Sequence, residues 1–151
     1  MKHALGRAAL ALIGAILPLT SPAQDLARQA HISVSSSRSE YPLSQVNDGD
    51  MGTSWSTALG QVKGQWLRMD WDSPQTMSGL ALYQTGPWTQ TIEAQVEQDG
   101  KWVTVGTSGT TTRKPPLVAV ITFKPVTAKA LRLLFEGGAA FFEIEVYSDP
   151  A

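Results

Sequence analysis

The sequence predicts an all-β protein, an antiparallel β-sandwich of about eight strands arranged as a jelly roll. Many segments of four to eight residues alternate between apolar and polar side chains, or are rich in β-branched and aromatic residues. Turn-forming residues separate these segments at near-regular spacing, as is typical of sandwiches. No segment of ten or more residues shows the periodicity of an amphipathic helix, and residues 25–30 could form one helical turn at most.

Each predicted strand follows from its own pattern. In residues 65–71, for example, Leu67, Met69 and Trp71 alternate with polar residues, so they are expected on the core face. Asp99 and Gly100 favour a tight hairpin between two neighbouring strands. The predicted strands comprise residues 31–37, 65–71, 79–84, 91–98, 101–106, 117–123, 130–135 and 141–147.

The first 23 residues have the pattern of a secretory signal peptide. Lys2 and Arg7 precede the apolar run 8–17, and the small residues Ser21 and Ala23 favour cleavage after Ala23. A retained membrane anchor is the alternative, but the run is shorter than the roughly 20 apolar residues of a spanning helix. We therefore expect a secreted or periplasmic protein, with a short lead at 24–30 and one domain at 31–149.

Composition restricts the possible functions. Without Lys2 and Arg7 the mature chain has ten basic and 13 acidic residues, a net charge of −3, which argues against nucleic-acid binding and against binding to an anionic membrane. There is no cysteine, and His31 is the only histidine after residue 23. The usual zinc and iron ligand sets are therefore missing. No nucleophile or carboxylate pair has a catalytic spacing, so we expect no enzymatic activity.

The loop QVNDGDMGTSW, residues 45–55, suits a hard cation such as calcium, which binds carboxylate, hydroxyl and carbonyl oxygens. It is not an EF-hand, because Thr53 stands where that motif needs glycine and Leu59 where it needs glutamate. Asp48 offers a carboxylate, but the loop alone has too few anionic ligands. It requires a distant carboxylate, and otherwise it is an Asx-rich turn without metal.

The last predicted strand offers two carboxylates. In FFEIEVY, residues 141–147, alternation places Phe142, Ile144 and Val146 on the core face. Glu143 and Glu145 then face away from the core, and a solvated strand face is the simplest interpretation of both.

Four stretches together resemble the coagulation factor V/VIII type C domain, also called the discoidin domain, of the galactose-binding-like fold. They occur in order and at family spacing over residues 31–148, and many bacterial members of this family are carbohydrate-binding modules. The stretches are ISVSSSRSEYPLSQVNDGDMGTSW, GQWLRMDWDSPQTMSGLALY, DGKWVTVGT and VTAKALRLLFEGGAAFFEIEVY.

The resemblance implies a structural calcium ion between the early loop and the last strand. Asp48 and Glu143 would contribute carboxylates, and Thr53 its hydroxyl. The remaining ligands would be the backbone carbonyls of Asn47, Asp50 and Phe142. Such an ion closes a loop of about 95 residues, for which a covalent cross-link would contribute at most about 4 to 5 kcal/mol. Trp55, which ends the loop, is expected in the core.

The resemblance also implies a binding module that recognises carbohydrate through loops at one end of the sandwich. Trp88 follows Gly86 and Pro87 in a predicted loop, with Gln84 nearby, and Arg38 and Tyr41 lie in the first long loop. These four residues, Arg38, Tyr41, Gln84 and Trp88, are the candidate sugar contacts. Trp88 could instead cover an edge of the sandwich. The segment before EIEVY is shorter than in sugar-binding relatives, so a protein-interaction or adhesion module of the cell envelope remains the alternative.

Overall fold

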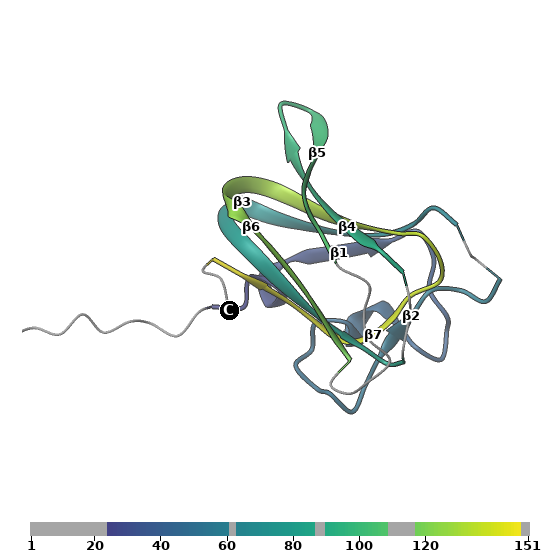
Figure 1. Cartoon of the computed structure of the whole chain (residues 1–151). Helices are drawn as coiled ribbons and strands as arrows, with labels where there is room; N and C mark the ends of the chain where they lie inside the picture. The colour runs from purple at the N-terminus through teal and green to yellow at the C-terminus, as the bar shows by residue number, and fades with distance from the viewer. Residues whose placement is uncertain (1–23, 61–62, 87–89, 109–116, 149–151) are drawn as a thin grey trace, which may run out of the picture.

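The structure is a computed structural model, and it describes residues 24–60, 63–86, 90–108 and 117–148; the predicted signal peptide and Trp88 lie outside these ranges. Two layers of β-sheet face each other, as Figure 1 shows, and this confirms the predicted β-sandwich. The elements in chain order are η1 (Leu26–Gln29), β1 (His31–Val34), η2 (Leu43–Gln45), β2 (Trp55–Ser56), β3 (Gln65–Gln84), β4 (Ile92–Gln98), β5 (Lys101–Thr107), β6 (Val118–Phe135) and β7 (Ala140–Tyr147).

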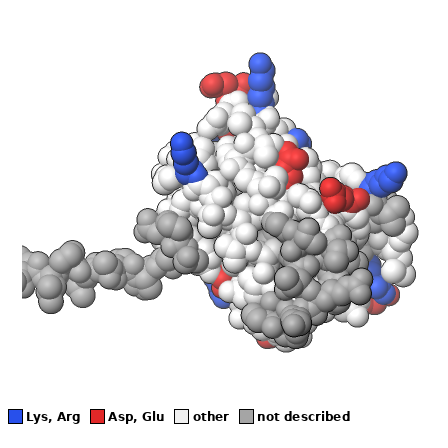
Figure 2. Space-filling view, viewed as in Figure 1, with Lys and Arg blue, Asp and Glu red and all other residues white. Residues whose placement is uncertain are grey.

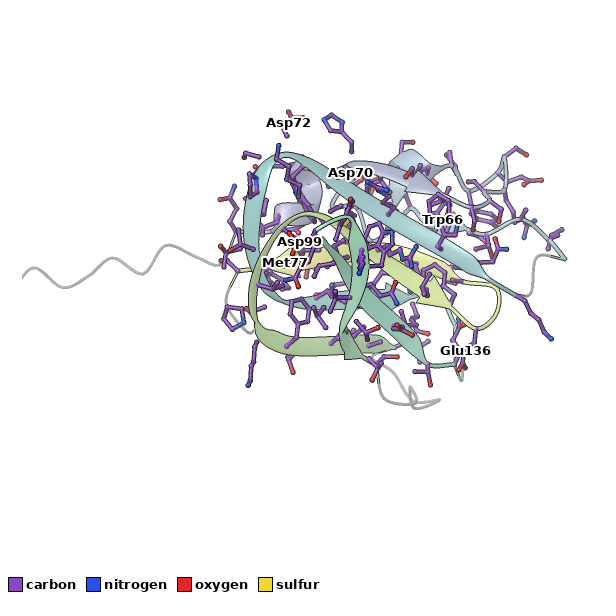
Figure 3. All side chains as sticks on the ribbon, turned by 90° about the horizontal axis from the view of Figure 1, so that it is seen from above. Trp66, Asp70, Asp72, Met77, Asp99 and Glu136 are labelled. Carbon is purple, nitrogen blue, oxygen red and sulfur yellow. The ribbon has the colours of Figure 1, made fainter. Side chains whose placement is uncertain are left out.

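All strand pairs are antiparallel, in the order β2-β7-β3-β6-β4-β5, and β1 pairs with β3. The first half of β3 pairs with β1 and with the second half of β6, and its second half pairs with β7 and with the first half of β6. Both long strands therefore turn the corner between the layers side by side (Figure 1). Figure 3 labels Trp66 and Asp70 before this corner and Met77 beyond it.

Two details of the strand prediction were wrong. Residues 65–71 and 79–84 form one strand, as do 117–123 and 130–135, because pairing resumes on both sides of the corner after irregularities at Asp70/Gln75 and Met77/Gly79. The short strand β2 was not predicted. The hairpin at Asp99 and Gly100 was predicted correctly, and both residues have the positive φ that such a two-residue turn requires.

The core lies between the layers, where side chains fill the space (Figure 3). Leu67, Met69 and Leu131 are fully buried, as alternation predicts for one face of a strand. Trp55 is also fully buried and stacks on Phe141, with ring centroids 6.2 Å apart. The prediction that Trp55 belongs to the core is therefore confirmed.

The surface carries charges of both signs. Figure 2 shows them singly or in pairs over the described part of the face in view, without a continuous basic patch. Among the described residues, no helix is long and apolar enough to cross a membrane.

Candidate functional site

Loops from distant parts of the chain enclose a cavity of about 590 Å³ at one end of the sandwich. This volume is within the range of small-molecule sites, roughly 300 to 1,000 Å³. Two of the four predicted sugar contacts, Arg38 and Tyr41, lie in its wall. The lining residues are Arg38, Tyr41, Ser54, Ser56, Thr57, Ala58, Leu59, Gly60, Thr85, Gly138, Ala139, Ala140 and Phe142.

Arg38 and Tyr41 form one side of the cavity. The guanidinium carbon of Arg38 lies 5.0 Å from the centroid of the Tyr41 ring, and the two residues form an isolated β-bridge. Glu40 pairs with Arg38 at 3.7 Å. Arg38 is the only charged residue among the described residues that line the cavity. A planar set of N–H donors therefore stands beside an aromatic ring that is 39% exposed.

The floor of the cavity is held rigidly. The backbone N–H of Thr57 donates to the carbonyl of Ala139 at 2.9 Å, and the backbone N–H of Ala139 donates to the Thr57 hydroxyl at 3.1 Å. Because the Thr57 hydroxyl also donates to the carbonyl of Ala139 at 3.3 Å, its hydrogen is already engaged. The side chains of Ala139 and Ala140 are small, so a ligand could approach the backbone closely.

Phe142 lines this cavity, which contradicts its predicted place on the core face. Tyr83 pairs with Glu143 and Gln84 with Phe141, so Phe142 is an extra residue in β7. Such a β-bulge changes the direction of the strand's side chains. Phe141 is consequently buried in the core, and Phe142 is turned toward the loops.

The other two predicted contacts are elsewhere. Gln84 is only 4% exposed and lines a smaller, adjoining cavity. Trp88 lies outside the described residues. Several cavity residues, among them Ser54, Ser56 and Thr85, were not predicted as contacts, although Ser54 and Ser56 flank Trp55 directly in the sequence.

The acidic loop folds through its own side chains. The Asp48 carboxylate accepts from the backbone N–H of Asp50 at 2.9 Å and from the Thr53 hydroxyl at 2.8 Å. The Asp50 carboxylate instead accepts from the backbone N–H of Gly52, and the Thr53 hydroxyl also lies 3.0 Å from the Asp50 carbonyl. Asp48 and Thr53 are thus brought together, while the Asp50 side chain serves a separate turn.

Glu143 reaches this loop from β7. One carboxylate oxygen, Oε2, accepts from the backbone N–H of Gly49 at 2.8 Å. Ile144 donates through its backbone N–H to the carbonyl of Val46, so the loop covers this part of β7. Glu143 is therefore 2% exposed, and its interpretation as part of a solvated face was wrong.

Only part of the cost of burying the Glu143 carboxyl is offset by hydrogen bonds and nearby charge. Its second oxygen, Oε1, is buried and has no hydrogen-bond partner among the described residues. Burial raises the pKa of Glu143 to about 7, and the Gly49 N–H and Arg28 offset this only in part. A cation beside Oε1 would stabilise the ionised form.

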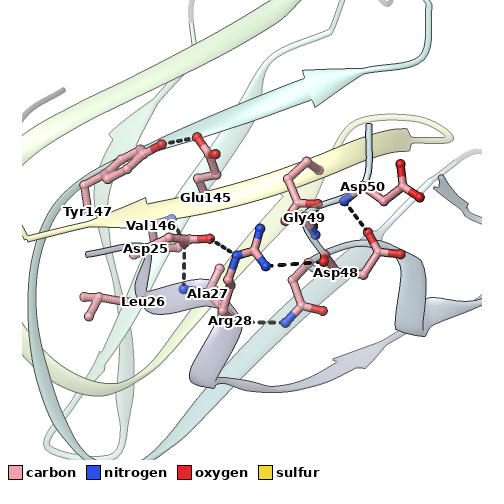
Figure 4. A network of polar contacts seen from close by, with 12 residues as sticks. Asp25, Leu26, Ala27, Arg28, Asp48, Gly49, Asp50, Glu145, Val146 and Tyr147 are labelled. Carbon is pink, nitrogen blue, oxygen red and sulfur yellow. Dashed lines mark hydrogen bonds and ion pairs between the residues drawn. The ribbon is translucent and has the colours of Figure 1, made fainter. Parts of the chain in front are cut away.

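The short helix η1, which Asp25 precedes, packs on the acidic loop, as Figure 4 shows. The Asp25 carboxylate accepts from the backbone N–H groups of Ala27 and Val146, both at 3.0 Å. Arg28 donates to the carbonyl of Asp48 at 3.3 Å, and the Asn47 amide donates to the carbonyl of Ala27. The Asn47 amide nitrogen thus anchors the loop to η1.

The donor set of the predicted metal site is made of oxygens. Two carboxylates, Asp48 and Glu143, and the Thr53 hydroxyl converge on the loop, and calcium prefers such ligands. No group of three or more His, Cys, Asp or Glu side chains suitable for a metal occurs in the described ranges. The remaining ligands would have to be carbonyls, as expected for Asn47, Asp50 and Phe142. The unpaired Glu143 Oε1 fits a cation at this place.

Comparison with known proteins identifies relatives of this fold. The family 32 carbohydrate-binding module of C. perfringens NanJ, solved in complex with galactose, superimposes with a TM-score of 0.72 at 21% identity, covering 83% of this chain and 99% of that one. Chitosan-binding module 1 of a chitosanase/glucanase from Paenibacillus sp. IK-5 gives 0.67 at 29% identity, covering 82% and 98%.

A third similar structure is CpGH89CBM32-5 from Clostridium perfringens, solved with GalNAc-β-1,3-galactose. Its TM-score is 0.70 at 14% identity, covering 82% of this chain and 99% of that one. No curated protein sequence matches the chain significantly. The model of the F5/8 type C domain matches residues 31–145. The chain therefore belongs to the F5/8 type C domain family.

Proposed function

We propose that this protein is a non-catalytic module that binds a neutral sugar in the cavity beside Arg38, Tyr41 and Phe142. The cavity itself carries the proposal, since it combines a volume of about 590 Å³ with two aromatic side chains and a guanidinium. Aromatic rings stack on the apolar face of a sugar, and an arginine donates to its hydroxyls.

The similar structures support this ligand class. Two of them contain galactose or GalNAc-β-1,3-galactose, and a third is a chitosan-binding module. A cationic sugar suits this cavity less well, because Arg38 is the only charged residue among its described lining residues. We therefore favour galactose-type sugars over chitosan.

Titration with galactose in a calorimeter tests the proposal. We expect saturable binding that is weakened at least tenfold in Arg38→Ala. Lys101→Ala provides the matched control, because Lys101 lies in the β4–β5 hairpin, which projects away from β2 (Figure 1). Absence of binding to galactose, to N-acetylgalactosamine and to a broad glycan array would overturn the proposal.

We further propose that a calcium ion binds between the acidic loop and β7, held by the carboxylates of Asp48 and Glu143, the Thr53 hydroxyl and backbone carbonyls of Asn47, Asp50 and Phe142. The buried, unpaired Oε1 of Glu143 supports this. Saturating calcium at 100 times its dissociation constant would stabilise the fold by about 2.7 kcal/mol. The melting temperature should therefore fall in chelator, and an unchanged value would exclude a structural ion.

We also propose that residues 1–23 are a cleaved signal peptide, so the protein acts outside the cytoplasm. The charged start, apolar run and small residues before Gln24 support this proposal. Mass spectrometry of the protein purified from an expressing cell should give a chain that begins at Gln24. A chain that retains Met1 and fractionates with the cytoplasm would contradict it.

A further inference from the structure

A second cavity of about 230 Å³ adjoins the first. The two cavities share Thr85 and Phe142. The residues that line the second cavity are Met51, Tyr83, Gln84, Thr85, Leu117, Val118 and Phe142. A ligand longer than one sugar unit could therefore occupy both cavities and pass along Phe142.

The β-bulge of β7 creates this arrangement. Without the extra residue, alternation would place the Phe142 side chain on the core face, and no aromatic ring would stand between the cavities. Bulges occur preferentially beside binding sites, where they redirect a side chain. The Phe142 ring therefore belongs to the walls of two adjacent spaces.

Gln84 gives the second cavity a specific polar group. Its side chain is 4% exposed, and the amide nitrogen Nε2 has no hydrogen-bond partner among the described residues. Buried amide donors are almost always paired, because an unpaired one destabilises the fold. Because this nitrogen is sealed from solvent, the amide would have to turn toward the second cavity for an acceptor on a ligand there to become its partner.

The rest of that cavity is largely apolar. Met51, Leu117 and Val118 line it together with the Phe142 ring, and Met51 is 51% exposed. A group that fits must combine a hydrogen-bond acceptor with a small apolar end. The acetamido group of an N-acetylated sugar has both, as a carbonyl oxygen for Gln84 and a methyl group for the apolar wall.

We propose that the second cavity is a subsite for the second unit of an oligosaccharide, and that this unit carries an N-acetyl group. The inference rests on the proposed function, because the first unit would occupy the larger cavity beside Arg38. Gln84 would donate to the acetamido carbonyl, and the methyl group would contact Met51 and Val118.

A matched pair of disaccharides provides the test. N-acetyllactosamine and lactose both begin with galactose, and they differ only in the acetamido group of the second unit. Calorimetric titration of the full mature chain with galactose, lactose and N-acetyllactosamine should give about tenfold tighter binding of N-acetyllactosamine than of lactose, equivalent to one hydrogen bond with its methyl contact.

Two variants identify the residues responsible. Gln84→Leu removes the unpaired donor at similar volume, and Met51→Ala removes an exposed part of the apolar wall without disturbing the core. Both should reduce the preference for N-acetyllactosamine and leave galactose binding unchanged. Val120→Ala is the control, since Val120 is 53% exposed on the same strand as Val118 and lines neither cavity.

The outcomes separate the two proposals. Galactose binding with equal affinities for lactose and N-acetyllactosamine would overturn the subsite and leave the proposed function intact. A preference that persists fully in Gln84→Leu would also overturn it. If none of the three sugars binds, the subsite proposal fails, and the glycan array then decides the proposed function separately.

Discussion

The buried Glu143 carboxyl leads to a prediction about stability and pH in the absence of calcium. Its pKa in the folded protein is raised from 4.5 to about 7, chiefly by burial. In the unfolded chain the carboxyl loses its proton near pH 4.5, whereas the folded chain keeps it until about pH 7. Because the folded state binds more protons over this interval, the contribution of Glu143 to stability falls as the pH rises from 4.5 to 7.

The difference between the two pKa values sets the size of the effect. Each pKa unit corresponds to about 1.4 kcal/mol, so the shift of Glu143 corresponds to about 3 kcal/mol as an upper value. Glu143→Gln cannot ionise, and its amide oxygen can still accept from the N–H of Gly49. In chelator, the free energy of unfolding of the wild type relative to this variant should therefore fall by about 2 to 3 kcal/mol between pH 5 and pH 8.

Urea denaturation of both proteins at pH 5 and pH 8, with chelator and with calcium, provides the measurement. The comparison with Glu143→Gln is necessary because burial also raises the pKa of the Asp25 carboxyl, which is present in both proteins. Calcium should abolish the pH dependence of the difference between the wild type and Glu143→Gln, because the ion holds Glu143 ionised. If, in chelator, the free energies of unfolding of the wild type and of Glu143→Gln differ by the same amount at pH 5 and at pH 8, the reasoning is refuted.

Two further predictions use matched pairs. Gly49→Ala should destabilise the fold by about 1 kcal/mol more than Gly100→Ala. Both glycines have positive φ, so the backbone strain of an alanine is similar at the two positions. A Cβ added to Gly49 would lie 1.6 Å from the Arg28 guanidinium, whereas a Cβ added to Gly100 would have no neighbouring atom within 4 Å. Equal urea midpoints for the two variants would contradict this. Trp102→Ala should lower the free energy of unfolding by about 1 to 2 kcal/mol, because the guanidinium carbons of Arg68 in β3 and Arg132 in β6 lie 5.1 and 4.4 Å from the centroid of its ring. Val103→Ala is the control on the same strand, and because Val103 is exposed it should change stability by about 0.5 kcal/mol or less. Thermal unfolding of both variants tests this, and a similar loss for both would oppose it.

Local patterns were sufficient for most of the fold. Alternation predicted Leu67 and Met69 in the core, and the Asp99 and Gly100 pair predicted its hairpin, because both depend on neighbouring residues alone. The continuity of β3 around the corner was not predictable in this way. It depends on pairing with β6, whose partner residues are at least 35 positions away in the sequence.

The site was predicted less completely than the fold. The sequence identified Arg38 and Tyr41 as candidate sugar contacts and joined Asp48 to Glu143, but it placed Phe142 in the core. It also did not separate Gln84, which lines the smaller cavity, from the residues of the larger one. The error at Phe142 comes from the bulge in β7, since one extra residue reverses the direction of the side chains before it. A bulge depends on the partner strand, so the alternation of FFEIEVY alone gives no sign of it.

The proposed ion and the proposed sugar should influence each other. The acidic loop continues directly into Ser54 and Ser56 of the cavity wall, and in β7 the cavity residue Phe142 precedes Glu143. An ion that fixes the loop against β7 therefore also fixes two walls of the cavity. Ordering these walls before the sugar arrives reduces the entropy lost on binding.

We accordingly expect calcium to tighten galactose binding by about fivefold, at the lower end of typical coupling between sites. Because such coupling is reciprocal, saturating galactose should tighten calcium binding by the same factor. Calorimetric titrations of each ligand, with and without the other, give both factors independently. Glu143→Gln should bind galactose with the affinity of the wild type in chelator and should not respond to calcium. Calcium could stabilise the wild type and yet leave its galactose affinity the same as in chelator. That result would show that the ion stabilises the fold without ordering the cavity for the sugar.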